Sequence, residues 1–223
     1  EKTLLLLPGW GFDASLFQSF IEKNLEKYTM YALTLPGYGN TKAYPMPPVS
    51  ESYGAGNWLQ GVEAGILRLL ETEKCEHPVL VAHFTVSSHI ALEIAAKYPD
   101  KFEKVVLVGG PATFHNPPPY DTLDYPARVK LIDRFIAPRW FKTVSRETWL
   151  KGNYPPGTYA VDSLLGQQLF EQANTAPLPI QIRYLCEYWA ADFSTYETVP
   201  IPVLAILPSF SSALFQNPNY FFT

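Results

Sequence analysis

Hydrophobic residues in this chain gather in short runs, separated by segments whose apolar residues recur at helical spacing. Short runs that are apolar throughout and end at Gly or Pro are typical of strands buried on both faces of a parallel sheet. The sequence predicts five strands, over Leu4–Leu7, Tyr28–Leu35, Val79–Ala82, Val105–Val108 and Ile201–Leu207.

The intervening segments predict helices. Asp13 is expected to cap the first, a second runs from Ser50 to about Glu73, and a third spans Thr85–Tyr98. Strict alternation of strands and helices calls for right-handed crossover connections. The sequence therefore predicts an α/β fold with a mostly parallel sheet and helices on both faces.

The alternation stops after the fourth strand. From about residue 112 to 199 the chain is rich in Pro, Trp and Tyr and holds no strand-like run. We predict a helical cap here, inserted before the last visible strand, with Pro117–Pro119 as an extended arm and residues 180–191 as the returning helix. The predicted organisation is a core over residues 1–111, the cap over 112–199, and the core continued over 200–223.

Composition narrows the class of partner. The 223 residues are 47% hydrophobic and 17% charged, which fits one globular domain with an insertion. No apolar run is long enough to span a bilayer, and a net charge of -4 without a basic cluster argues against nucleic acid or an anionic membrane. We expect a small-molecule ligand, neutral or cationic, as the partner.

The two cysteines, Cys75 and Cys186, lie far apart and lack metal-ligand spacing. We therefore expect isolated thiols, no metal and no cofactor. Free thiols favour a reducing compartment, which predicts a cytoplasmic location.

Three local sequences mark the turns that follow the first three strands. They are Pro8–Phe12 (Pro-Gly-Trp-Gly-Phe), Leu35–Gly39 (Leu-Pro-Gly-Tyr-Gly) and His83–Val86 (His-Phe-Thr-Val), the last of which leads into a helix. In order, they resemble the His-Gly-x-Gly turn, the Asp-x-Pro-Gly-x-Gly turn and the Gly-His-Ser-x-Gly nucleophile elbow of α/β-hydrolases. Thr34 stands where the second motif usually has Asp.

This resemblance covers nearly all of the chain outside the cap and identifies it as a member of the α/β-hydrolase superfamily. It implies that the visible strands are the third to the seventh of that fold, so we expect a chain truncated at both ends. The Gly-Trp-Gly of the first turn is especially similar to carboxylesterases of the type that serves biotin synthesis. This similarity implies that the chain belongs to a capped, carboxylesterase-like branch of the superfamily.

The elbow that carries this resemblance holds Phe84 where the family has its nucleophile. A phenyl ring has neither a lone pair nor a proton to release, so it cannot attack an ester. Ala82 and Val86 stand where the motif has glycines. The hydroxyls of Thr85, Ser87 and Ser88 are close to the elbow in sequence. On a helix that begins at the elbow, however, they point in other directions than the elbow side chain does.

The anion-stabilising half of such a site depends on the backbone alone. The resemblance assigns it the amides of Thr85, after the elbow, and Trp10, in the first turn. A pocket made by these donors could bind a carbonyl, a carboxylate or dioxygen. The alternative is that both amides only close their turns.

The remaining triad members are not found at their usual places. The family's acid follows the last visible strand, but residues 208–212 contain no carboxylate, and neither does the alternative position at 109–111. The family's catalytic histidine would lie beyond Thr223. Of the histidines present, His83 is the elbow neighbour and His115, which enters the cap, is a pocket candidate.

Aromatic residues in a cap over the sheet edge can line an apolar pocket. The pocket candidates are Phe12, Phe84, His115, Trp140, Trp149 and Trp189. The alternative is that the cap aromatics form the cap's own core.

Two classes of function follow from these observations. One is a hydrolase of a small ester-like or apolar substrate, whose catalytic competence is questioned by Phe84. The other is a non-catalytic protein that binds a small ligand or a partner on the same scaffold. Chemistry that needs no nucleophile, of the oxygenase or lyase type, is a third possibility.

Overall fold

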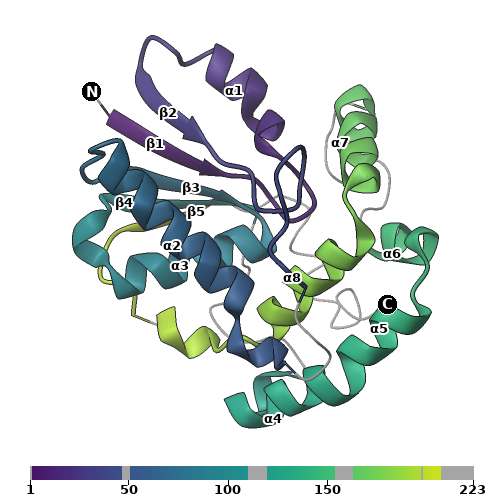
Figure 1. Ribbon diagram of the computed structural model, residues 1–223. Coiled ribbons are helices and arrows are strands. Elements are labelled where there is room, and N and C mark those ends of the chain that lie inside the picture. The colour runs from purple at the N-terminus through teal and green to yellow at the C-terminus, as the bar shows by residue number, and fades with distance from the viewer. Residues whose placement is uncertain (1, 47–50, 110–119, 154–162, 197, 207–223) are drawn as a thin grey trace.

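The computed structural model describes residues 2–46, 51–109, 120–153, 163–196 and 198–206. Within these ranges a single parallel sheet has the strand order β2-β1-β3-β4-β5 (Figure 1). The strands are β1 (Lys2–Leu7), β2 (Tyr28–Ala32), β3 (Val79–His83), β4 (Lys104–Val108) and β5 (Val203–Ile206). The predicted α/β fold with a mostly parallel sheet is confirmed.

Side chains alternate along β1 and divide the core between two faces of the sheet. Leu5 and Leu7 pack in the larger core with helices α2 (Asn57–Thr72) and α3 (Thr85–Lys97). Leu4 and Leu6 face the opposite side, where they pack with residues of the 3-10 turn Ala14–Phe17 and of α1 (Gln18–Glu22). Helices therefore cover both faces, as the alternation of elements predicts.

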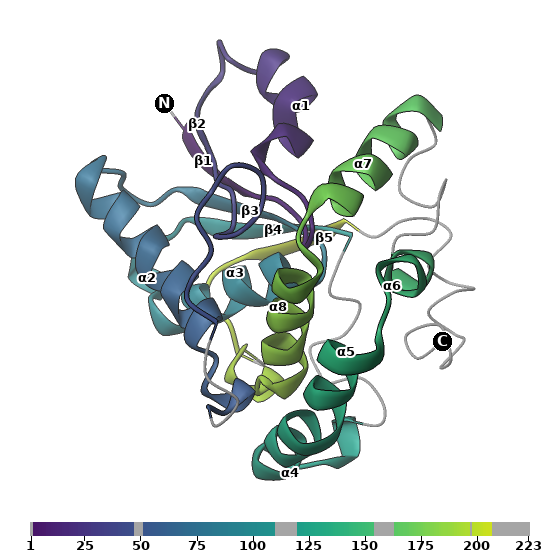
Figure 2. The ribbon, with the colours of Figure 1, turned by 45° about the vertical axis from the view of Figure 1, so that its right-hand side comes forward.

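In the described residues between β4 and β5, the regular structure is helical. Its helices are α4 (Tyr125–Leu131), α5 (Ala137–Thr143), α6 (Arg146–Asn153), α7 (Ser163–Thr175) and α8 (Leu178–Ala190), with a π-helical turn at Ile132–Ile136 that joins α4 to α5. Figures 1 and 2 show them beside the carboxyl ends of the strands, with α8 packed against the start of α2 and against α3. The predicted boundaries between core and cap, 111/112 and 199/200, stay predictions. Residues 110–119, which contain Pro117–Pro119, lie outside the described residues.

Two predicted helix starts differ in outcome. The cap at Asp13 is confirmed, because its carboxylate accepts a hydrogen bond from the Ser15 amide at 2.9 Å. The prediction that the second helix starts at Ser50 is wrong. The helix begins at Asn57, since Gly56 adopts a left-handed backbone conformation (φ 62°) that separates it from the 3-10 turn Tyr53–Ala55.

Helix α8 is joined to the core by a buried carboxylate. Glu187 accepts hydrogen bonds from the amides of Trp58 (2.9 Å) and Leu59 (3.0 Å), and it is ion-paired with Arg183 one turn earlier on α8. The first amides of a helix lack acceptors within the helix, and Gly56 offers α2 no side-chain cap. Glu187 therefore caps α2 from another element, in a place where the helix dipole favours negative charge.

In the described part of the chain, no helix combines the length and the apolar character needed to cross a bilayer.

A polar cluster lies between α2 and α3. The Lys97 ammonium lies 3.0 Å from Glu63 and 2.7 Å from Glu93, and His89 lies 3.0 Å from Glu93. Burial, followed by the neighbouring charge of Glu93, raises the pKa of Glu63 to about 7. Burial opposes ionisation of Glu93 as well, but hydrogen bonds from His89 and Lys97 outweigh it and hold the pKa of Glu93 below its usual range.

The raised pKa of Glu63 predicts a specific pH dependence of stability. An acid whose pKa rises from 4.5 to about 7 on folding binds its proton more tightly in the folded state, so stability falls as the pH rises through that interval. Relative to the wild type, Glu63→Gln should gain about 1 to 3 kcal/mol of unfolding free energy between pH 4.5 and 7. Urea denaturation at several pH values measures this difference, in which titrating groups outside the cluster of Glu63, Glu93, His89 and Lys97 cancel. Glu71→Gln, at an exposed position of α2, should show no such gain. Parallel pH curves for wild type and Glu63→Gln would contradict the prediction.

The turn after β1 packs closely against the end of β3. A Cβ atom placed on Gly9 would lie 2.4 Å from Nδ1 of His83 and 3.2 Å from its carbonyl oxygen. Glycine is thus needed here for the close approach of the two segments.

We expect Gly9→Ala to destabilise the fold by about 1–3 kcal/mol, because the buried imidazole must shift to admit the methyl group. The matched control is Gly65→Ala in α2, where a Cβ atom would meet nothing within 4 Å. That substitution should stabilise the protein by about 0.5–1 kcal/mol through helix propensity. Chemical denaturation compares the two variants, and equal midpoints would refute this account of the turn.

Candidate functional site

The connection from β3 to α3 is a sharp turn at one residue. Phe84 has φ 53° and ψ 147°, and Thr85, the first residue of α3, has φ 34°. Positive φ is uncommon outside glycine and costs of order 1–3 kcal/mol per residue. The Phe84 amide donates to the carbonyl of Val108 at 3.0 Å, which extends the ladder between β3 and β4 to the elbow. The backbone thus has the strained strand-to-helix form that displays a nucleophile in this kind of turn.

The side chain at the elbow carries no reactive atom. The half-buried ring of Phe84 lies over the end of β4, where its Cδ2 would be 3.5 Å from a Cβ atom on Gly109. Its centroid is 6.2 Å from that of His83. A hydrocarbon ring fills this place, so the elbow residue can contribute contact area but no covalent step.

The neighbouring hydroxyls are held within the core. Ser87 donates to the carbonyl of Pro8 and so ties α3 to the first turn. The hydroxyl oxygens of Thr85 and Ser88 are buried and have no hydrogen-bond partner among the described residues. Cys186 on α8 is also buried, and burial raises the pKa of its thiol well above the usual range. None of these groups occupies the exposed position of an elbow nucleophile.

His83 lies directly before the elbow. Burial lowers the pKa of its imidazole to about 4, so the ring is neutral at pH 7. Its Nδ1 has no hydrogen-bond partner among the described residues, and its ring meets that of Phe12 edge-on at 6.0 Å. His83 is thus a neutral part of the packing under the elbow.

Backbone donors remain at the elbow. Helix α3 has 13 residues, and its first amide belongs to Thr85, so the partial positive charge of its N-terminus lies at the turn. Trp10 lies in the neighbouring turn after β1, with its side chain buried. The assignment of the Thr85 and Trp10 amides as oxyanion-type donors stays a prediction.

The indole of Trp10 joins the core to the cap. Its Nε1 donates to the backbone carbonyl of Gln181 at 2.9 Å, while the Gln181 side chain accepts from Nε1 of Trp149 at 2.9 Å. Trp149 meets Trp10 edge-on at 5.5 Å and Trp140 at 5.4 Å. Gln181 therefore holds the first turn and α6 together.

The predicted pocket residues are only partly brought together. Phe12, Trp149 and Trp189 are buried in the same core cluster, against which Trp140 packs, but the ring partners differ: Trp149 meets Trp10 and Trp140, whereas Trp189 stacks on Tyr120 at 5.2 Å. His115 lies outside the described residues, as do the acid positions 110–111 and 208–212. Ligand contact by these aromatic residues stays a prediction.

A hollow that the sequence did not predict lies at the boundary between core and cap. It has a volume of about 310 Å³ and is lined by Tyr44, Pro45, Met46, Glu51, Asn57, Trp58 and Arg183. The available signal was the pair Arg183 and Glu187, opposite charges one turn apart on an otherwise uncharged helix.

Comparison with known proteins agrees with this geometry. The model of the alpha/beta hydrolase family matches residues 4–215. A pimeloyl-(acyl-carrier protein) methyl ester esterase from Proteus mirabilis is 38% identical over 48 residues, which cover 22% of this chain and 18% of that protein. The protein of the same name from Pectobacterium atrosepticum is 23% identical over 111 residues, or 50% of this chain and 38% of that protein. The matched segments thus span less than half of either relative.

Among solved structures, the esterase EaEST from Exiguobacterium antarcticum is similar with a TM-score of 0.67 and 18% identity, covering 92% of this chain and 72% of that one. MenH from S. aureus is similar with a TM-score of 0.61 and 16% identity, covering 99% of this chain and 80% of that one. These likenesses show the fold. The distant similarity to the two methyl ester esterases confirms the predicted resemblance to an esterase branch, and the match over most of the sequence shows that the chain belongs to the α/β hydrolase family.

Proposed function

We propose that this protein binds a small acyl or ester-like molecule between the elbow and the cap, and that it does so without forming a covalent intermediate at the elbow. The observation that carries the proposal is Phe84. It stands at the position where the fold displays a nucleophile, on strained backbone with positive φ, and its side chain offers only carbon atoms.

Two features support ligand binding. The N-terminus of α3 offers an amide at Thr85 whatever side chain the elbow carries, and such donors favour a carbonyl or carboxylate oxygen. The half-buried ring of Phe84 supplies apolar surface beside them.

A second candidate function is ester hydrolysis in which water attacks directly. It is favoured by the same amide at the start of α3, which could stabilise an oxyanion, and by the names of the two relatives, both methyl ester esterases. This route requires a general base from outside the described residues. It leaves no acyl group on the protein, whereas a serine-type mechanism does.

We expect no covalent labelling of the protein by a fluorophosphonate, because this reagent reports an activated hydroxyl and the elbow has none. Intact-mass spectrometry after incubation measures the addition, and turnover of para-nitrophenyl butyrate is followed in parallel. Stoichiometric addition to any serine or threonine would refute the proposal. Turnover without addition would favour the second candidate, direct attack by water.

We also expect Phe84→Ala to weaken binding of methyl hexanoate by about tenfold, because the aromatic contact is lost. Titration followed by tryptophan fluorescence measures the affinity. The matched control is Phe20→Ala, which removes an exposed ring on α1 and should leave the affinity unchanged. Unchanged affinity in Phe84→Ala would remove the elbow from the ligand site.

A further inference from the structure

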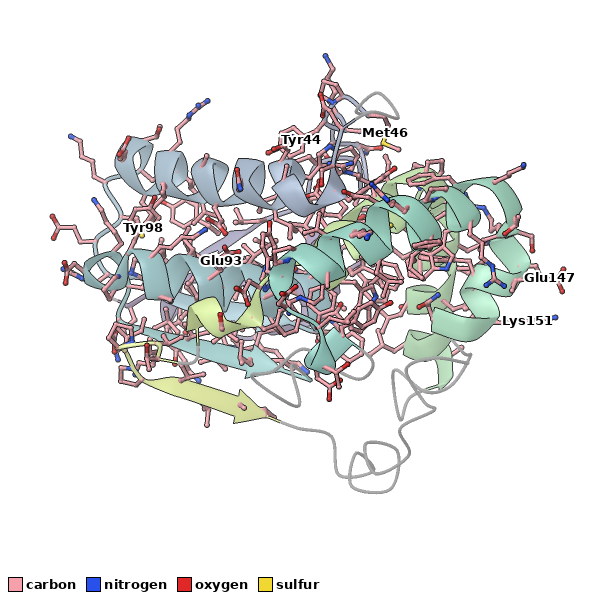
Figure 3. All side chains as sticks on the ribbon, turned by 90° about the horizontal axis from the view of Figure 1, so that it is seen from below. Tyr44, Met46, Glu93, Tyr98, Glu147 and Lys151 are labelled. Carbon is pink, nitrogen blue, oxygen red and sulfur yellow. The ribbon has the colours of Figure 1, made fainter. Side chains whose placement is uncertain are left out.

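A continuous helix forms the outer edge of the cap. Helix α4, the π-helical turn Ile132–Ile136 and α5 follow one another without a break from Tyr125 to Thr143. On the inner side of this helix Ala137 is buried in the core, and Asp133 accepts a hydrogen bond from the Tyr53 amide at 2.8 Å. Figures 1 and 2 show the helix beyond α8, on the side away from the sheet, and Figure 3 views the molecule from that side. The outer side of the helix faces solvent.

The outer side of this helix is basic. Its exposed cations are Lys130, Arg134, Arg139 and Lys142. No ion pair among the described residues involves any of these four side chains. Lys130, Arg134 and Lys142 lie at multiples of four residues, a step that advances about 40° beyond a full turn in an α-helix. The π-helical turn offsets part of this advance, because it needs more residues to complete a circle. The three side chains therefore stay on one side.

A phenyl ring lies among these cations. Phe135 is 62% exposed and lies one helical turn before Arg139. Asp133, the one acidic residue between positions 125 and 143, is turned inward. On the neighbouring α6, Glu147 is ion-paired with Lys151 at 2.7 Å, and Figure 3 shows both at the edge of the molecule. The outer side therefore joins positive charge to exposed apolar surface, and no carboxylate of its own helix interrupts it.

A partner for this face must satisfy two requirements. The cations require negative charge, and the ring requires hydrocarbon within reach of the same helical turn. An anionic phospholipid bilayer offers both, because its phosphates lie directly above its acyl chains. An acidic protein would satisfy the charge, but it would also need an apolar pocket opposite a convex helix. Charge complementarity and the exposed ring together favour lipid.

We propose that the outer side of α4 and α5 docks on an anionic phospholipid surface. Lys130, Arg134 and Lys142 contact lipid phosphates, and the ring of Phe135 inserts below them. Such a surface was not expected from the sequence, where two to four residues separate successive cations and no basic run results. The winding of the helix gathers them on one side. Phe84 and the elbow take no part in this contact.

Cosedimentation with vesicles tests the lipid surface. The whole chain is incubated with phosphatidylcholine vesicles, and with vesicles that contain phosphatidylcholine and phosphatidylglycerol in about equal amounts. We expect binding to the anionic vesicles to be at least about tenfold tighter. The preference should disappear as salt is raised from about 0.05 M to about 0.5 M, because salt screens the cations. Equal affinity for the two kinds of vesicle, or no binding to either, would overturn the proposal.

Two independent variants locate the contact. Lys130→Glu combined with Arg134→Glu reverses two of the cations, and Phe135→Ser removes the ring. All three positions are exposed, so both variants should keep the denaturation midpoint of the wild type. Each should bind anionic vesicles at least about tenfold more weakly. Wild-type affinity in either variant would overturn the site.

The matched controls lie on α1 and in the turn that follows it. Lys23→Glu combined with Lys27→Glu makes the same change of charge at exposed positions, and Phe20→Ser removes another exposed ring. Both should bind anionic vesicles within about twofold of the wild type. An equal loss in the charge control would show that net charge determines binding, which overturns the assignment to this helix.

A depth measurement separates lipid from an acidic protein partner. Phe135→Trp is added to anionic vesicles whose acyl chains carry bromine, which quenches an indole that reaches the acyl region. We expect quenching beyond the level of the wild type, and weaker binding to soluble polyglutamate than to the vesicles. Quenching at the wild-type level, or polyglutamate binding as tight as vesicle binding, would favour an acidic protein and overturn the lipid proposal.

Discussion

The strained backbone at Phe84, with positive φ, is the constraint on which the arrangement of the core depends. The ladder between β3 and β4 runs to His83, opposite Val108, and the chain must then start α3 at once to cover the sheet. A turn this short requires positive φ at Phe84 and again at Thr85. The strain persists because the packed core around the turn fixes its conformation. Strained backbone of this kind is common at functional sites.

The neighbours of the elbow explain how the fold keeps this turn without its catalytic residue. Ala82 and Val86, which replace the motif's glycines, are both fully buried in the core. Ser87 and Gly9 then bind the first turn to the elbow, one through a hydrogen bond and one through close approach. The elbow therefore contributes to the packing of the core. The amide of Thr85 at the start of α3 does not depend on which side chain position 84 carries.

The cap is attached by polar groups that serve two elements at once. Gln181 bonds the indoles of both Trp10 and Trp149, and its amide nitrogen donates to carbonyls at the end of α7. Six residues later on α8, Glu187 caps α2. Breaking either joint would leave buried polar groups unpaired, so α8 is held in one position against the core.

Local patterns in the sequence were enough to predict the strands, the parallel sheet and the unusual elbow, because buried runs and turn motifs involve residues adjacent in the chain. The start of α2 was not predictable in the same way, since it depends on the conformation of Gly56 and on a carboxylate from α8. The hollow at Arg183 is lined by three separate segments and was invisible for that reason. The aromatic residues of the cap were recognised as a group, but composition does not say which rings meet. Trp149 meets Trp10, whereas Trp189 stacks on Tyr120.

A crystal structure of the protein soaked with methyl hexanoate tests the central claim most directly. We expect an intact ester beside the ring of Phe84, with its carbonyl oxygen within hydrogen-bond distance of the Thr85 amide and no bond to the protein. Density continuous between an acyl carbon and any side chain would contradict it.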